Sequence, residues 1–258
     1  MQLVMDIGNT HMVIGLFDDQ TLVRDWRIHT NPALTEDEFH IMITGLFSLH
    51  QLQSENIGNV VISCVVPPMM RMMEVFCRKY LNLAPCWVDA SNAGIPILYD
   101  NPAEVGADRL VNAVAAYHKY PTSLIVIDFG TATTFDAISG KGEYLGGAIA
   151  PGIGIAAEAL FQRASKLPRV DLIKPPAKAI GKDTAASMKS GILFGYAGLV
   201  DGMVGRIARE MAPAEPRIIA TGGLAPVMQD ISETIECVEP HLTLEGLRII
   251  SNRMSQVK

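Results

Sequence analysis

Two stretches of this sequence place an acid, a glycine and hydroxyl side chains directly after a run of apolar residues. The first is Asp6-Ile7-Gly8-Asn9-Thr10 and the second is Asp128-Phe129-Gly130-Thr131-Ala132-Thr133-Thr134. At a tight turn, backbone N–H groups and short hydroxyls can converge on anionic oxygens, while a carboxylate holds a cation or a water. The combination predicts phosphate chemistry at both turns.

Each of these turns also has a plainer interpretation, because an aspartate can simply hydrogen-bond its own turn. The joint appearance of both turns is more specific than either alone. A third segment, Thr221-Gly222-Gly223, follows an apolar strand pattern and would let an adenine or ribose approach the backbone. Alone, it is an ordinary turn between a strand and a helix.

Asp108 is the candidate catalytic base. Phosphoryl transfer requires a positioned phosphate and an acceptor hydroxyl in line with the bond to be broken, and a carboxylate can orient that hydroxyl. Arg109 beside it suits a carboxylate or phosphate on the acceptor. The alternatives are that Asp108 caps the helix that starts here and pairs with Arg109, and that Arg109 forms a surface salt bridge.

The spacing of apolar residues predicts the elements that carry these residues. In the first half, Thr35 and Glu38 form a capping-box pattern at the start of a helix. The expected strands of this half are 2–7, 12–17, 21–28, 57–66 and 86–88, and its helices are 36–50, 69–80 and 107–119. The expected strands of the second half are 123–129, 132–138, 143–149 and 217–220, and its helices are 154–165, 184–210 and 243–256.

The order of elements is repeated, strands first and then helices, so we expect an α/β protein of two similar domains, 1–118 and 119–258, with a nucleotide cleft between them. The helix 184–210 carries glycines at positions 191, 195, 198 and 202. Glycine weakens a helix, so this spacing predicts that another helix packs closely against it.

Composition limits the classes of function. The chain has 258 residues, is 49% hydrophobic and carries a formal charge of −6, which argues against a basic surface for nucleic acid. Its four cysteines form no CxxC pair, so we expect reduced thiols. No apolar run reaches the roughly 18 residues needed to cross a bilayer once its glycines and Asp201 are counted as interruptions, so we expect a soluble, cytoplasmic protein without a membrane partner.

Taken together, the motifs resemble those of type III pantothenate kinases, members of the actin-like, sugar-kinase and heat-shock ATPase superfamily. The resemblance covers essentially the whole chain, and several motifs occur in the family's order. They are Asp6 to Thr10, Gly106-Ala107-Asp108-Arg109, Asp128 to Thr133, Gly146-Gly147 with Pro151-Gly152, Gly181 to Thr184 with Ser190-Gly191, and Thr221-Gly222-Gly223.

The resemblance implies two ribonuclease H-like domains, ATP-dependent phosphorylation of pantothenate to 4'-phosphopantothenate, and a role in the first step of coenzyme A biosynthesis. It assigns Asp108 as the catalytic proton acceptor and Asp128 as the ligand of a monovalent cation, potassium or ammonium, while magnesium accompanies ATP. The ATP-binding residues that it implies are Asp6, Ile7, Gly8, Asn9, Thr10, His11, Met12, Val13 and Thr131. The substrate-binding residues that it implies are Tyr99, Gly106, Ala107, Asp108, Arg109 and Thr184.

The resemblance also implies a homodimer, in which Thr184 reaches the site of the other subunit. His11 stands where the family most often has asparagine, which affects the shape of the first turn. Two rival hypotheses remain: a non-enzymatic regulator on the same scaffold, which would be expected to have lost Asp6, Asp108 or Asp128, and an ATP-driven actin-like or chaperone module, for which the chain is short.

Overall fold

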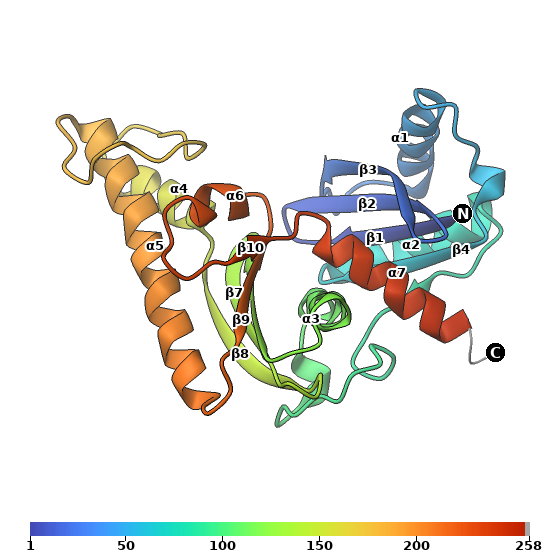
Figure 1. Ribbon diagram of the computed structural model, residues 1–258. Coiled ribbons are helices and arrows are strands. Elements are labelled where there is room, and N and C mark those ends of the chain that lie inside the picture. The colour runs from blue at the N-terminus through green and yellow to red at the C-terminus, as the bar shows by residue number, and fades with distance from the viewer. Residues whose placement is uncertain (256–258) are drawn as a thin grey trace. The chain divides into compact units, whose positions relative to one another are not determined.

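The computed structural model describes residues 1–255 and contains two compact units (Figure 1). The first unit comprises Met1–Gly94, Asn101–Ala115 and the C-terminal segment from Thr243, and the second comprises Ile95–Asp100 and Ala116–Leu242. The contacts therefore group the C-terminal segment with the first unit, whereas the division expected from the sequence assigns it to the second half. The domain limits 1–118 and 119–258 stay a prediction.

The first unit is built on a five-stranded sheet in the order β3-β2-β1-β4-β5. Strand β1 is antiparallel to β2 and parallel to β4. The strands are β1 (Gln2–Ile7), β2 (His11–Asp18), β3 (Thr21–His29), β4 (Asn59–Cys64) and β5 (Cys86–Trp87). The helices are α1 (Glu36–Ser48), α2 (Pro67–Tyr80), the start of α3 (Ala107–Lys119) and α7 (Leu242–Ser255), with short 3₁₀ helices at Ser54–Asn56 and Pro102–Glu104.

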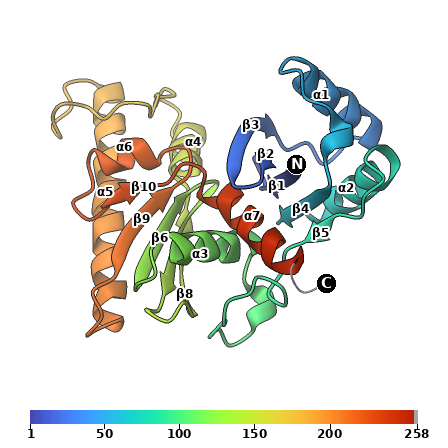
Figure 2. The ribbon, with the colours of Figure 1, turned by 45° about the vertical axis from the view of Figure 1, so that its right-hand side comes forward.

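Alternation along β1 separates a core face from a second face. Leu3, Met5 and Ile7 are buried in the core that α1 and α2 complete, and Figure 2 shows these two helices on one side of the sheet. Helix α7 packs against Gly15 of β2, where an added Cβ would lie 3.0 Å from Leu244 Cδ1. Asp6 alternates with the core residues, so its carboxylate lies on the face opposite to α1 and α2.

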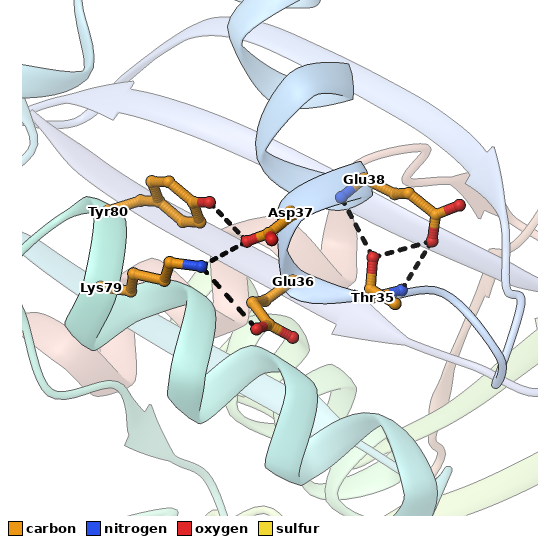
Figure 3. A network of polar contacts seen from close by, with 6 residues as sticks. All are labelled: Thr35, Glu36, Asp37, Glu38, Lys79 and Tyr80. Carbon is orange, nitrogen blue, oxygen red and sulfur yellow. Dashed lines mark hydrogen bonds and ion pairs between the residues drawn. The ribbon is translucent and has the colours of Figure 1, made fainter.

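The start of α1 confirms the predicted capping box, in which Thr35 Oγ1 accepts from the Glu38 amide and the Glu38 carboxylate accepts from the Thr35 amide. The same turn is tied to the end of α2, because Asp37 accepts from Lys79 Nζ and from the Tyr80 hydroxyl (Figure 3). These exposed contacts fix one helix against the other and do not reach the predicted site.

The second unit is built on a five-stranded sheet in the order β10-β9-β6-β7-β8. Its strands are β6 (Leu124–Phe129), β7 (Ala132–Ile138), β8 (Tyr144–Pro151), β9 (Arg217–Thr221) and β10 (Cys237–Val238). Its helices are the end of α3, α4 (Ile153–Arg163), α5 (Thr184–Glu210) and α6 (Ala225–Gln229). Helices α4 and α5 lie side by side, and buried residues of α5 share one core with Ile125 and Ile127 of β6 (Figures 1 and 2).

The two sheets repeat one plan. Strands β1, β2 and β4 correspond to β6, β7 and β9, since in each unit the first strand is antiparallel to its successor and parallel to the third. Every residue of β1 is buried except half-buried Asp6, and every residue of β6 is buried except half-buried Asp128. The predicted α/β class with two similar halves is confirmed.

Every predicted element is present, with shifts only at the ends, and helices 107–119 and 184–210 have the predicted limits. Helix α2 begins at Pro67, two residues earlier than predicted, because proline is well suited to the first turn of a helix, where its missing N–H leaves no bond unmade. The short elements α6 and β10 and the two 3₁₀ helices were not predicted.

The expectation that no stretch is long and apolar enough to cross a bilayer is wrong for α5. By length and composition α5 passes that test, because its glycines do not reduce apolar character in the way that charged residues do. Among the described residues it is the one such helix, and a single helix of this kind is weak evidence for a membrane span; a third of the relevant window is buried. The four cysteines are free, as predicted.

Candidate active site

The first candidate turn joins β1 to β2 through Gly8, Asn9 and Thr10, of which Asn9 and Thr10 are exposed. It is closed by the Gly8 amide, which donates to His11 O over 3.0 Å. Thr30, just beyond β3, holds it from outside: its hydroxyl donates to Gly8 O at 2.6 Å and its amide to Thr10 O at 3.0 Å. The turn is thus a backbone loop held in one conformation by His11 and Thr30.

The Asp6 carboxylate is oriented from the neighbouring parallel strand. Asp6 and Ser63 are paired across β1 and β4, and the fully buried Ser63 hydroxyl donates to Asp6 Oδ1 at 2.7 Å. This contact selects one orientation of the carboxylate, because a buried hydroxyl without a partner would lose free energy.

His11 starts β2, and its ring stacks on the ring of His29 with the centroids 4.9 Å apart. Burial, followed by the positive charges of Arg27 and His29, lowers the pKa of His11 below its usual value. His11 is therefore neutral at pH 7 and contributes hydrogen bonding, rather than charge, to the first turn. Met12 and Val13 continue β2, and Met12 is buried in the core.

The segment Gly106-Ala107-Asp108-Arg109 forms the start of α3. The Asp108 carboxylate folds back over Gly106, where an added Cβ would lie 2.5 Å from Asp108 Oδ1, and it accepts from the Arg109 amide at 2.9 Å. Burial raises the pKa of Asp108, against the lowering effect of the Arg109 amide and charge. Arg109 itself is buried rather than on the surface.

The second candidate turn, between β6 and β7, consists of Gly130 and Thr131. Gly222 has φ +93°, and a Cβ there would lie 2.6 Å from Asp128 Oδ1 and 2.7 Å from Phe129 O. The missing side chain of Gly222 therefore lets a carboxylate oxygen and a carbonyl oxygen pack against its Cα. A Cβ on Gly152 would likewise collide with the carbonyl oxygens of Thr131 and Gly130. Such hard oxygen donors suit an alkali or alkaline-earth cation.

The remaining predicted residues lie in the second unit. Tyr99 belongs to the segment Ile95–Asp100, and its ring packs over Gly146, where an added Cβ would lie 3.5 Å from two ring carbons. Thr184 is the exposed first residue of α5, directly after Asp183, whose side chain caps the helix by accepting from the Ala186 amide.

The structure thus gathers the predicted residues into two sets. Asp6 to Val13 and Gly106 to Arg109 lie in the first unit, and Tyr99, Asp128, Thr131 and Thr184 lie in the second. Sequence reasoning missed Ser63 and Thr30. The signal for Ser63 was weak, because a serine near the end of a buried strand becomes informative only when the pairing of β4 with β1 is known.

Comparison with known proteins gives one consistent family. The family model described as type III pantothenate kinase matches residues 2–206. A type III pantothenate kinase of Desulfatibacillum aliphaticivorans is 64% identical over 99% of both chains, and one of Geobacter sulfurreducens is 56% identical over 98% of this chain and 99% of the relative.

Solved structures support the fold at low sequence identity. A Campylobacter jejuni protein described as a putative Baf family transcriptional activator superposes with a TM-score of 0.61 at 17% identity, covering 98% of this chain and 99% of that one. An inorganic polyphosphate/ATP-glucomannokinase from Arthrobacter superposes with a TM-score of 0.52 at 13% identity, covering 98% of both chains. At these identities the likeness is one of fold.

Proposed function

Because the chain belongs to the type III pantothenate kinase family, we propose that it transfers the γ-phosphoryl group of ATP to the primary hydroxyl of pantothenate. The product is 4'-phosphopantothenate, and the reaction is the first step of coenzyme A biosynthesis. One observation carries the proposal: the family match spans residues 2–206, which include every predicted site residue from Asp6 to Thr184.

Asp108 is the general base in this proposal. Its raised pKa supports the role, because a carboxylate of higher basicity accepts a proton more readily from an alcohol. In a loose phosphoryl-transfer transition state, its main task is to hold the hydroxyl in line with the phosphorus. Arg109 follows it on α3 and is assigned to an anionic group of the acceptor.

The first turn is assigned to the phosphates of ATP. The amides of Asn9 and Thr10 would receive the phosphate oxygens, while Gly8, whose amide donates to His11 O, would shape the loop. Thr131 is likewise assigned to ATP. Asp6 offers oxygen ligands of the kind that magnesium prefers, directly or through its waters, and Ser63 fixes their direction. When bound, magnesium neutralises part of the phosphate charge.

A monovalent cation, potassium or ammonium, is assigned to Asp128. The oxygen atoms here support the assignment, because Asp128 Oδ1 and the neighbouring Phe129 O both lie beside Gly222 and such cations favour carboxylate and carbonyl oxygens. When bound, the cation offsets negative charge beside the nucleotide.

We assign the protein as a homodimer in the cytoplasm, acting on small molecules rather than on nucleic acid or membranes. Positions 191, 195, 198 and 205 of α5 support the dimer, since a Cβ at each of these glycines would meet no atom of the described chain within 4 Å. Exposed Leu145 and Ile149 on β8 and Ile155 on α4 add apolar surface to the same unit. Thr184 at the start of α5 would then act across the dimer.

The test is a coupled assay of the purified protein with ATP and magnesium, offering pantothenate against a panel of small hydroxylated acids, with and without potassium or ammonium. We expect the protein to phosphorylate pantothenate and none of the other acids in the panel. Asp108→Asn should keep the fold and lose about 10²–10⁴-fold in turnover. Full activity in Asp108→Asn would remove the residue from its role, and absence of turnover in the wild type would overturn the proposed function.

The pH dependence gives a second check on Asp108. Since burial raises its pKa, the acid limb of the kcat/KM profile should lie above the ordinary aspartate value of 3.8. The folded state holds this proton more tightly than the unfolded chain, so stability falls as pH rises through the folded pKa. Asp108→Asn should therefore unfold at the same or a higher temperature than the wild type at pH 7, measured by thermal melts.

A further inference from the structure

A carboxylate is buried in the second unit at a position that the proposed chemistry does not use. Asp136 of β7 has no solvent exposure, and it accepts from the Tyr144 hydroxyl at 2.7 Å and from Thr134 Oγ1 at 3.3 Å. Tyr144 is also fully buried. A buried carboxylate contributes little to stability compared with a packed apolar side chain. We therefore ask which neighbouring residues Asp136 holds in place.

A β-bulge brings Tyr144 to this carboxylate. The register of β7 with β8 shifts between Ala137 and Ile138, so that Leu145 is the extra residue between Tyr144 and Gly146. Gly146 has φ +119°, a conformation that residues with side chains rarely adopt. Bulges change the direction of side chains, and here the Tyr144 hydroxyl reaches an aspartate two residues from its own strand partner, Ile138.

The backbone of Tyr144 holds the segment that precedes Tyr99. Its amide donates to Pro96 O and its carbonyl accepts from the Leu98 amide, both at 2.8 Å, which makes Ile97 a parallel bridge partner of Tyr144. Tyr99 follows directly, and its ring lies 6.4 Å from the Tyr144 ring. The ring also covers Gly146, the residue after the bulge. The position of Tyr99 is thus set by the strand that Asp136 anchors.

The hydrogen bond between Thr134 and Asp136 leads to the second candidate turn. Thr134 is the cross-strand partner of Asp128 on β6, so the two side chains share one face of the sheet. Asp136 is therefore hydrogen-bonded to Thr134, which lies beside the assigned cation ligand Asp128. It is also hydrogen-bonded to Tyr144, whose backbone holds segment 95–100. Both ends of this chain of contacts lie within the second unit.

We propose that the buried Asp136–Tyr144 pair is a positioning device for the acceptor substrate: it holds segment 95–100, and through it Tyr99, in the place required to bind pantothenate. The inference rests on the proposed function and names two residues that act through Tyr99 rather than on the substrate. It follows that the pair affects acceptor binding and leaves ATP binding unchanged.

The test compares Tyr144→Phe with Tyr117→Phe. The first variant removes the hydroxyl that reaches Asp136 and keeps the ring, whereas the second removes an exposed hydroxyl that donates to Gly140 O at 3.1 Å in the same unit. For Tyr144→Phe we expect KM for pantothenate to rise about tenfold, with kcat and KM for ATP within about twofold of wild type, as loss of one bond to a buried carboxylate implies. Tyr117→Phe should leave all three constants within about twofold.

Asp136→Asn is the conservative variant. Its amide oxygen can still accept from Tyr144 and its NH₂ group can donate to Thr134, so KM for pantothenate should rise less than in Tyr144→Phe. Hydrogen–deuterium exchange provides a readout without substrate. In Tyr144→Phe, exchange should become faster in segment 95–100 and remain unchanged in α5.

Unchanged exchange in segment 95–100 of Tyr144→Phe would overturn the anchoring role. Faster exchange with an unchanged KM for pantothenate would overturn the link to the substrate, as would equal increases in the KM values for pantothenate and ATP. A wild-type protein that does not phosphorylate pantothenate would instead overturn the proposed function and, with it, the substrate part of this inference, while the exchange experiment would still decide whether the pair anchors the segment.

Discussion

The two acid-glycine turns occupy the same place in corresponding sheets, yet their surroundings differ. In the first unit the hydroxyl of Ser63, the β4 partner of Asp6, donates to the Asp6 carboxylate. In the second unit the β9 partner of Asp128 is Thr221, and its hydroxyl donates to Glu239 O at 2.8 Å. The same strand position thus orients a carboxylate in one unit and anchors a following loop in the other.

The turns also differ in length and in what they enclose. The first contains Gly8, Asn9 and Thr10, and the second only Gly130 and Thr131. The longer turn contains more backbone amides, whereas the carbonyl oxygens of the shorter turn pack against Gly152. A repeated scaffold thus carries turns of different shape, and the proposed function assigns an anion to one copy and a cation to the other.

The largest expected effect comes from adding a methyl group at Gly222, which packs against the residues just before the second turn. Gly222→Ala forces a positive φ on alanine and brings Cβ to 2.6 Å from Asp128 Oδ1, so we expect a loss of about 3 kcal/mol or more in the free energy of unfolding. Gly8→Ala meets only His11 O at 3.2 Å, at a φ that alanine can adopt, and should cost about 1 kcal/mol or less.

Urea unfolding of both variants measures this difference. Equal losses of stability in Gly222→Ala and Gly8→Ala would show that Gly222 is no more tightly packed than Gly8.

An intermediate effect is expected from the paired hydroxyls. Ser63→Ala leaves Asp6 without its buried donor, so turnover should fall about tenfold and the magnesium concentration for half-maximal ATP binding should rise. Thr221→Val removes the bond to Glu239 O and should lower stability by about 1 kcal/mol, with a smaller loss of turnover per folded molecule than Ser63→Ala.

Steady-state kinetics and ATP titrations at several magnesium concentrations, together with thermal melts, separate these two outcomes. A larger loss of turnover in Thr221→Val than in Ser63→Ala would reverse the assigned roles of the two hydroxyls.

The smallest effect concerns His11, which has no counterpart at the second turn. Its pKa is lowered in the folded state, so the unfolded chain binds this proton more tightly and stability falls as pH drops below the usual histidine value of 6.5. His11→Asn removes this dependence. Between pH 7.5 and 5.5, the melting temperature of wild type should fall slightly more than that of His11→Asn, and equal falls would contradict the shift.

The sequence was sufficient for the parts that local chemistry controls. The capping box at Thr35 and Glu38 marks the start of α1, and the apolar runs before Asp6 and Asp128 identify the central strands. Motif order alone was also enough to recognise the family. Local patterns of this kind can be recognised in a sequence because each involves residues only a few positions apart.

The supporting contacts could not be predicted in this way. Ser63 and Asp6 are 57 positions apart and become partners only through the parallel pairing of β1 and β4. Asp136 meets Tyr144 only because a bulge shifts β8, and no local pattern marks that bulge except Gly146. Their roles depend on register, which requires the assembled sheet.

The place of α7 has a consequence for how this protein is made. Its residue Leu244 fills the space beside Gly15 near the start of the chain, and a Cβ on its Gly246 would collide with Val111 of α3. During vectorial synthesis the first unit therefore emerges from the ribosome without its last helix, whereas nearly all of the second unit is complete before α7 is translated. The half of the enzyme that is made first is accordingly the half that finishes folding last.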